Sequence, residues 1–374
     1  MYRKTYACIN LDAIKYNFNN ALKLSKKEYG FAVVKANGYG HGAVDVAKAA
    51  IKGGATHLAV ATFEEALELR KEFNKVPILV LGYTDFKYFT VASKYAITVT
   101  LTNMYQAEKL ANYNEPLKIH IKVNTGMNRL GFSNLEDVRK AYALIRYNTN
   151  LAVEGLFTHF STADMMDIGF YKKQFEMFET IVDDIGKFFK IIHCQNSAAT
   201  LYPLEGMNKC NAFRFGIAMY GYNPSDEKIP DFELSEAFSL YSEVSSVIPV
   251  RKGGKVGYGA TYALKKDGYI ATIPIGYADG IIRANSSREV MINNKRFPIV
   301  GRVCMDQLMI LVDESVKIGD VVELIGKNIT MSEVSKHLNT IDYEVLCSIS
   351  DRVTRVYFEN SKEVHEKCFR YILN

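Results

Sequence analysis

Short apolar segments rich in β-branched residues recur along the first part of the chain, and between them apolar positions return every three or four residues. The second pattern is typical of amphipathic helices, and it is clearest in Phe63–Phe73, Leu135–Tyr147 and Tyr171–Ile185. Strands that alternate with helices predict parallel βα units, and eight of them close a (β/α)8 TIM barrel. The apolar segments predict eight buried strands: Phe31–Val34, His57–Ala61, Ile78–Leu81, Ala96–Leu101, Ile119–Val123, Leu151–Phe157, Ile191–Cys194 and Ala212–Ile217.

The pattern changes after Tyr222. The polar, proline-bounded segment Asn223–Pro230 predicts a linker, and the helix–strand alternation stops beyond it. We therefore expect two domains: an α/β barrel over residues 1–230 and a mostly β domain over residues 231–374. The elements expected in the second domain are strands at Ser239–Val250, Tyr269–Ile275, Val290–Ile292, Arg296–Val300 and Val321–Ile325, a hairpin turn at Asn293–Lys295, and one helix near Ser332–Leu338.

Composition narrows the classes of partner. The net charge of +5 comes from 46 basic and 41 acidic residues spread along the chain, without the clustered basic surface of a nucleic-acid-binding protein. No apolar run reaches the ~18 residues of a membrane span. The six cysteines form no CxxC pair, which predicts a reduced, cytoplasmic setting. The seven histidines never fall at ligand spacing, so we expect no metal site.

One strand end carries an unusual combination of residues. Lys35 ends the β-branched run Ala32–Val34 and is followed by Gly38, Gly40 and Gly42. An apolar surround disfavours the ammonium form of a lysine and leaves its amine more nucleophilic, and a flexible loop leaves room for a bulky group beside it. A lysine that forms a Schiff base needs both. The ordinary alternative is a solvated charge at a strand edge.

Further polar residues stand at predicted strand ends, where a barrel of this type carries its functional groups. Arg214 lies inside the apolar run Phe213–Ile217, where an arginine needs a partner. From residue types alone, a structural ion pair for Arg214 and a satisfied core position for His159 remain open beside a role in catalysis. The residues that follow a predicted strand are Lys35, Arg129, His159, Asn196 with Ser197, and Gly216.

The stretch AVVKANGYGHG around Lys35 is similar, nearly letter for letter, to the pyridoxal-phosphate attachment motif of bacterial alanine racemases. Other long motifs follow in the family's order, so the chain resembles the alanine racemase family over essentially its whole length. The resemblance implies a barrel that carries pyridoxal phosphate (fold type III) and a β domain that completes the partner subunit's active site in a head-to-tail homodimer. It also implies a small amino-acid substrate, alanine, whose L and D forms are interconverted for peptidoglycan precursors.

The resemblance implies two catalytic bases. Lys35 joins the cofactor aldehyde and serves one face of the substrate, and Tyr258 of the motif GYGATY serves the other face from the partner subunit. His159 hydrogen-bonds that tyrosine and links it toward Arg214, which faces the pyridine nitrogen. Because a guanidinium keeps its proton, the ring nitrogen stays unprotonated, which favours racemisation over transamination. Tyr258 alone would carry no such signal, because the chain holds 24 tyrosines.

Other implied roles concern binding. Arg129 contacts the cofactor's phenolic oxygen and the substrate carboxylate, and Lys122 matches a lysine that is often carbamylated. The Met305 backbone N–H meets the same carboxylate, and Tyr277 narrows the substrate corridor. The residues implied to hold the cofactor phosphate are Tyr39, Ser197, Gly216 and Ile217, and Asn196 is a further implied cofactor contact.

Three positions depart from the family's pattern. Asp351 stands where a tyrosine usually helps to hold the phosphate and walls the pocket, and Asn124 and Asn128 replace the usual Asp and Gly. A smaller, polar residue at 351 adds room and a hydrogen-bond acceptor, which makes serine a second candidate substrate, as in serine racemases of the glycopeptide-resistance type. Two further alternatives are a non-catalytic pyridoxal-phosphate carrier, which would lack the Tyr258 element, and a decarboxylase, whose substrate motif is not visible.

Overall fold

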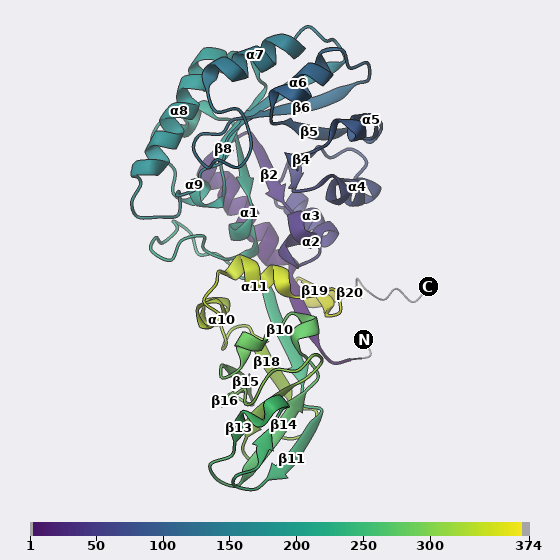
Figure 1. Cartoon of the computed structure of the whole chain (residues 1–374), viewed down its shortest axis with the longest axis vertical. Coiled ribbons are helices and arrows are strands. Elements are labelled where there is room, and N and C mark those ends of the chain that lie inside the picture. Colours follow the sequence, from purple (N-terminus) through teal and green to yellow (C-terminus); the bar gives the residue numbers. More distant parts are fainter. Residues whose placement is uncertain (1–2, 369–374) are drawn as a thin grey trace. The chain divides into compact units, whose positions relative to one another are not determined.

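The structure is a computed structural model and describes residues 3–368. It falls into two compact units (Figure 1). The first consists of Ala13–Gly38 and Ala43–Glu236, and the second consists of the residues up to Asp12, Tyr39–Gly42 and the residues from Ala237 onward.

The first unit is built on a closed barrel of parallel strands, β2 to β9. All eight strands predicted from the apolar runs are confirmed, including the run that holds Arg214, and so is the (β/α)8 fold class. The strands are β2 (Tyr29–Val33), β3 (His57–Val60), β4 (Ile78–Tyr83), β5 (Ile97–Leu101), β6 (Leu117–Lys122), β7 (Leu151–Phe157), β8 (Ile191–Gln195) and β9 (Ala212–Phe215).

Helices connect the barrel strands, and the three helices predicted from periodicity are confirmed. The start of α4 shows why the sequence folds as it does: the Thr62 side chain accepts a hydrogen bond from the Glu65 N–H, and the Glu65 side chain returns one to the Thr62 backbone, a capping box. The helices are α1 (Leu11–Ser25), α3 (Ala43–Lys52), α4 (Phe63–Glu72), α5 (Phe89–Lys94), α6 (Met104–Ala111), α7 (Leu135–Ile145), α8 (Gly169–Ile185) and α9 (Ser197–Leu201), with short 3-10 turns η1 (Phe86–Tyr88), η2 (Gly186–Phe188), η3 (Met207–Lys209) and η4 (Ile217–Tyr220).

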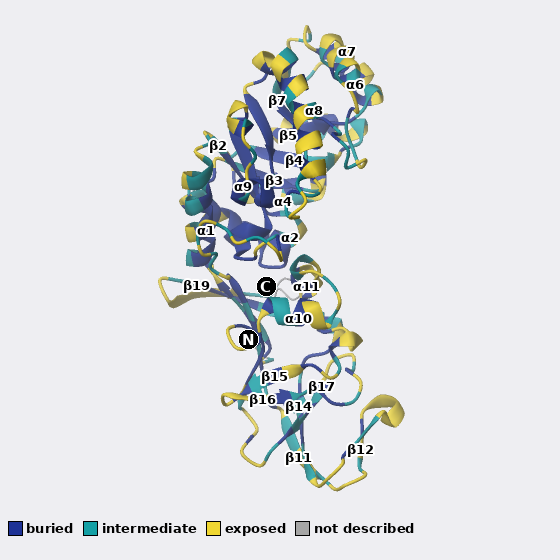
Figure 2. Cartoon of the chain, turned by 90° about the vertical axis from the view of Figure 1, so that its left-hand side faces the viewer, coloured by how far each residue is buried: buried dark blue, intermediate teal, exposed yellow. Residues whose placement is uncertain are grey.

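The barrel strands are largely buried, whereas the helices around them expose one face (Figure 2). Every residue of β5, β8 and β9 is buried. A strand buried on both faces carries apolar residues without alternation, which explains why continuous apolar runs marked these strands in the sequence. The few polar residues inside the barrel are therefore conspicuous.

The second unit is mostly β, as predicted. A seven-stranded sheet has the order β16-β15-β18-β10-β1-β19-β20, a three-stranded sheet the order β11-β14-β17, and β12 pairs with β13. The strands are β1 (Tyr6–Asn10), β10 (Phe238–Glu243), β11 (Ser246–Val250), β12 (Lys255–Val256), β13 (Tyr262–Ala263), β14 (Gly268–Ile273), β15 (Glu289–Ile292), β16 (Lys295–Pro298), β17 (Leu308–Val312), β18 (Val321–Ile325), β19 (Thr354–Glu359) and β20 (Lys362–Lys367).

Three features of the second unit differ from the sequence-based expectation. The N-terminal strand β1 pairs with β10 and β19, although the expected first domain began at residue 1. The run Ser239–Val250 is not one strand: it breaks at Val244 and Ser245, whose N–H groups donate to the Asp320 and Thr272 carbonyls, and its halves join different sheets. Two α-helices follow β18 rather than one, namely α10 (Met331–His337) and α11 (Asp342–Ser348).

The predicted hairpin is confirmed. β15 and β16 pair antiparallel, with Ile292 opposite Lys295, so Asn293 and Asn294 form a two-residue loop. Both have positive φ, 49° and 61°, as the favoured hairpin turns require, and asparagine tolerates that conformation better than most residues. Among residues 3–368, no helix is long and apolar enough to cross a membrane.

Candidate active site

Lys35 follows β2 and opens the short element α2 (Lys35–Tyr39), whose backbone is left-handed. Ala36, Asn37 and Gly38 have φ of 51°, 50° and 62°. Each non-glycine residue in this conformation costs about 1–2 kcal/mol, so surrounding contacts must hold it. The Glu65 carboxylate accepts from the Ala36 N–H at 2.7 Å. Such strain is typical of functional sites.

Arg214 in β9 is buried, with 3% of its surface exposed, and neutral atoms accept its hydrogen bonds. Its Nη1 donates to His193 Nδ1 at 2.8 Å and to the His193 carbonyl at 3.1 Å. Its Nη2 donates to the carbonyls of Thr158 and Cys194 at 2.8 and 3.2 Å. Among the described residues no carboxylate pairs with it, so a structural ion pair is excluded there.

Two consequences follow for the Arg214 guanidinium. Burial lowers its pKa to about 10, which still leaves it protonated at neutral pH. Within residues 3–368, Nε is the nitrogen of this side chain that meets no acceptor. One directed N–H donor therefore remains for a ligand.

His159 is the second residue after β7, and its Nδ1 lies 3.5 Å from Arg214 Nη2. Burial holds its pKa well below the usual value, and the nearby cations Arg214, Lys122, Arg129 and Lys35 lower it further. The imidazole is therefore neutral at physiological pH. The charges of four basic side chains thus act on this one histidine.

Lys122 ends β6 and is buried, with 7% of its surface exposed. Its Nζ donates to the Val123 carbonyl at 2.8 Å and lies 5.2 Å from the centre of the Phe157 ring. Burial, and then the charges of Arg214 and Arg129, hold its pKa well below the usual value. The neutral amine of this lysine is therefore favoured relative to that of a solvent-exposed lysine.

Arg129 lies on the loop after β6 and is exposed. Within residues 3–368 no side chain or carbonyl pairs with its guanidinium. Asn124 organises this loop, since its Oδ1 accepts from the N–H groups of Asn128 and Gly126 at 2.8 and 3.3 Å. Asn128 has a φ of 55°, and asparagine is one of the few residues that can replace glycine in that conformation.

Ser197 and Gly216 meet where β8 and β9 end. The Gly216 N–H donates to Ser197 Oγ at 2.8 Å, so the serine's own hydroxyl proton remains available. Ile217 opens η4, and the first N–H groups of a helical turn have no acceptor within it. Asn196 caps α9: its Oδ1 accepts from the Ala199 N–H at 2.9 Å, and its Nδ2 donates to the Phe160 carbonyl at 3.1 Å. Its side chain thus places Ser197.

The other residues that the sequence predicts for the site belong to the second unit. Tyr258 stands on η5 (Tyr258–Ala260) with 72% of its surface exposed, and Met305 is 54% exposed. Tyr39 is buried, 6.1 Å from Tyr343 between ring centres. Asp351 is exposed.

Backbone contacts join the Tyr277 and Met305 segments. Tyr277 opens η6 (Tyr277–Asp279), and its N–H donates to the Cys304 carbonyl at 3.0 Å, while the Ala278 N–H donates to the Met305 carbonyl at 3.0 Å. A side chain on Gly276 would lie 2.3 and 2.4 Å from those two carbonyls. The second unit therefore presents Tyr277 and Met305 together.

The Asp351 segment is fixed to the same loops. Arg352 pairs with Asp306 at 2.8 Å and with Asp279 at 3.5 Å. Arg355, fully buried, donates to the carbonyls of Gly40, Ser350, Val353 and Ile349 at 2.6–2.9 Å, and so ties the Tyr39 segment to the end of the chain. Sequence reasoning missed both Arg355 and His193. The signal for His193 was the presence of a polar side chain in a buried apolar strand.

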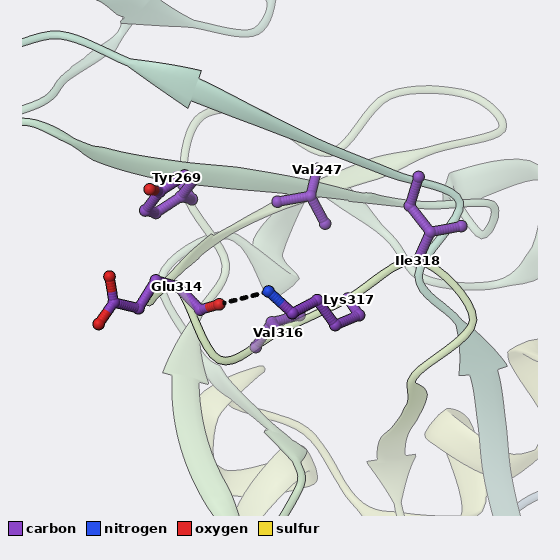
Figure 3. Close-up of a pocket in the computed structure, with 6 residues that line it drawn as sticks. All are labelled: Val247, Tyr269, Glu314, Val316, Lys317 and Ile318. Carbon is purple, nitrogen blue, oxygen red and sulfur yellow. Dashed lines mark hydrogen bonds between the residues drawn. The ribbon is translucent and has the colours of Figure 1, made fainter.

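A shallow pocket of about 630 Å³ lies on the sheet of the second unit, and Figure 3 shows its lining. Lys317 Nζ donates there to the Glu314 carbonyl at 2.9 Å. The pocket contains none of the site residues above. Its lining residues are Val247, Tyr269, Glu314, Val316, Lys317 and Ile318.

The strand ends of this (β/α)8 barrel carry an amine, a neutral imidazole, a buried guanidinium and N–H donors, and a β unit follows the barrel. This combination is typical of an enzyme built on a barrel. The family model described as "Alanine racemase, N-terminal domain" matches residues 9–224, and "Alanine racemase, C-terminal domain" matches residues 237–357. The chain belongs to the alanine racemase family, which is a family of isomerases. The resemblance stated from the motifs is confirmed.

Individual relatives agree over nearly the whole length. The alanine racemase of Halalkalibacterium halodurans is 45% identical, over 98% of each chain. Alanine racemase 1 of Bacillus subtilis is 43% identical, over 96% of this chain and 94% of that one. The crystal structure of alanine racemase from Bacillus anthracis with bound L-Ala-P superposes with a TM-score of 0.94 at 38% identity, over 99% of this chain and 98% of that one.

Proposed function

We propose that this chain is a pyridoxal-phosphate-dependent racemase that interconverts L- and D-alanine. The observation that carries the proposal is the group of side chains at the barrel's strand ends, where Lys35 follows β2 and His159 Nδ1 lies 3.5 Å from Arg214 Nη2. The family membership supports alanine as the substrate.

The residues fit the proposed cofactor. A pyridine nitrogen needs a donor, and Arg214 Nε is a donor without an acceptor among the described residues. A phosphate dianion needs N–H and O–H donors, and Ser197 with the start of η4 offers them. An aldehyde needs a primary amine, which Lys35 supplies. When bound, the cofactor would supply a sink for the electrons released at the substrate α-carbon. We assign its binding to Lys35, Tyr39, Arg129, His159, Asn196, Ser197, Arg214, Gly216 and Ile217.

Two residues would move the proton. Inversion needs an acid and a base on opposite faces of the α-carbon, and we assign these roles to Lys35 and to the partner subunit's Tyr258. Tyr258 is 72% exposed in one protomer, so its phenol is accessible to a partner subunit. A neutral His159 can exchange hydrogen bonds with a phenol.

We assign substrate binding to the first unit of one subunit together with the second unit of its partner. Arg129, exposed and without a partner among the described residues, would bind the substrate carboxylate together with the Met305 N–H. Tyr277, next to Met305 in the second unit, would narrow the approach, and Asp351 would border the substrate side chain. We therefore propose a homodimer with shared sites. All six cysteines lie among the described residues and none of them forms a disulfide, which supports a reducing, cytoplasmic location.

We also propose that Lys122 is carbamylated. A neutral lysine amine adds to carbon dioxide, forming an N–C bond and releasing a proton to water. The product is an anion, which would pair with Arg129 and remove the repulsion between that arginine and a lysine cation. The lowered pKa of Lys122 and the nearby charge of Arg129 support this assignment.

A coupled racemisation assay with L- and D-alanine tests the proposal. The purified protein loaded with pyridoxal phosphate should convert both enantiomers, and Lys35→Ala should lose at least about a thousandfold in kcat together with the visible absorption of the bound cofactor. An exposed lysine such as Lys140, changed to Ala, is the control. Retention of racemisation and cofactor absorption in Lys35→Ala would refute the proposal.

A further inference from the structure

Inside the barrel, a line of polar side chains continues from Arg214 away from the strand ends. His193 Nδ1 accepts from Arg214 at 2.8 Å, and His193 Nε2 lies 2.9 Å from His120 Nδ1. His120 Nε2 lies 3.9 Å from a Glu154 carboxylate oxygen. His120 and His193 have 1% and 0% of their surfaces exposed. Glu154 keeps 16% exposure and also lies 3.4 Å from Lys118.

The two ends fix the direction of this line. An arginine only donates and a carboxylate only accepts. Because His193 Nδ1 accepts from Arg214, the proton of its neutral ring is on Nε2, which donates to His120 Nδ1. The neutral His120 then carries its proton on Nε2, the nitrogen nearest Glu154. Burial lowers the pKa of both histidines, which agrees with neutral rings.

The barrel is shaped around this line. Gly155 on β7 lies opposite His120 on β6, and a Cβ there would come within 2.2 Å of the His120 ring. The His193 ring stacks between two phenylalanines, with centroids 4.9 Å from Phe31 and 4.6 Å from Phe157. Rings held in this way cannot turn freely, so the hydrogen-bond direction is built into the packing.

We propose that His193, His120 and Glu154 are positioning residues that orient Arg214 through one directional line. Hydrogen bonds join Arg214, His193 and His120, and the Glu154 carboxylate lies 3.9 Å from the far end of the line. The guanidinium has only neutral partners around it, and the carboxylate at the far end of the line is the charge that polarises the imidazoles toward it. Hydrogen bonds in such a line strengthen one another in a low-dielectric interior. The line leaves Arg214 Nε free, which is the donor that the proposed function assigns to the cofactor ring, and for this catalytic consequence the inference rests on that function.

The tautomers can be observed directly without activity. In protein labelled with ¹⁵N-histidine, long-range ¹H–¹⁵N correlation spectra distinguish Nε2–H from Nδ1–H rings. Both His193 and His120 should be neutral Nε2–H tautomers at pH 7. His120→Phe keeps a ring in the same space but removes the acceptor of the His193 Nε2–H group. His193 should then no longer be held in the Nε2–H form. An Nδ1–H tautomer or a protonated ring at either position of the wild-type protein would overturn the proposal.

Kinetics of the cofactor-loaded enzyme provide the second test. His120→Phe should lower kcat by about tenfold, the effect of one lost buried hydrogen bond, while the KM for alanine stays within about twofold. His57→Phe is the matched control, because His57 is also a barrel histidine stacked on Phe31 but bonds Thr56 instead. If His120→Phe and His57→Phe have equal kcat values, the line does not position Arg214.

Glu154→Gln keeps the proposal testable should His120→Phe not fold. It retains an acceptor and removes the charge, so kcat should fall by several-fold, whereas Glu136→Gln, on the exposed pair with Lys140, should change nothing. A wild-type protein without racemase activity would refute the proposed function, and the tautomer spectra would still decide on the line itself. An active wild type with an unaltered Glu154→Gln variant refutes the charge's role alone.

Discussion

Gly155 and His120 face each other across β7 and β6, and a methyl group on Gly155 would overlap the His120 ring at 2.2 Å. Both positions lie in the packed barrel, so neither can move aside without disturbing the His193 contact. Gly155→Ala should therefore lower the free energy of unfolding by about 1–3 kcal/mol. Denaturant unfolding measures it, and Gly268→Ala, whose Cβ would meet ordinary contacts at 3.5 Å, is the control. Equal stabilities of the two variants would contradict the packing argument.

Carbon dioxide should bind covalently to the wild-type protein. After incubation with ¹³C-bicarbonate, a carbamate carbon signal should appear, and it should be lost in Lys122→Ala but kept in Lys140→Ala. Acidification should remove the signal because it protonates the amine and releases carbon dioxide. Depletion of bicarbonate should weaken alanine binding, seen as a raised KM. A signal that persists in Lys122→Ala would assign the carbamate elsewhere.

Stability should fall on mild acidification of the cofactor-free protein. Burial lowers the folded-state pKa of His57 to about 4 and also lowers that of His120 and His193, whereas unfolded histidines titrate near ~6.5. Below that pH the unfolded chain binds more protons than the folded one, so each histidine costs about 1.4 kcal/mol per pH unit. Between pH 6 and pH 5, the free energy of unfolding should therefore change less steeply with pH in His57→Phe than in the wild-type protein, by this amount. An unchanged slope would mean that His57 titrates normally in the folded protein.

The residue at 351 should set the preference between alanine and serine. Asp351→Tyr should lower the kcat/KM for serine relative to alanine by about tenfold, because it fills space and removes an acceptor for the hydroxyl. Asp351→Asn keeps the size and an acceptor and should preserve the ratio. Both ratios come from one coupled assay with the two amino acids. A ratio unaffected by Asp351→Tyr would remove serine as a candidate substrate on this ground.

The barrel was predictable because its signal is local. Each strand is a buried apolar run, and each candidate residue such as Lys35 or Ser197 could be placed at a strand end from the neighbouring sequence alone. The motif around Lys35 and those that follow it then pointed to the family.

Other features depend on partners that are distant in sequence. Arg355 bonds Gly40, and His120 bonds His193, so no local pattern marks either contact. The break at Val244 depends on where two N–H groups find carbonyls on other strands. Asn196 donates to the Phe160 carbonyl, 36 residues earlier in the chain, and no local pattern marks this contact either.

The position of β1 governs the order in which the chain can be assembled during synthesis. The strands of the barrel are all available once Phe215 has been made, so the first unit can fold while translation continues. Tyr6–Asn10, which precedes the barrel in the sequence, must wait for Phe238–Glu243 on one side and Thr354–Glu359 on the other. This strand is thus made before the barrel but can acquire both neighbours only after it, and its apolar residues stay available to chaperones until Thr354–Glu359 has been made.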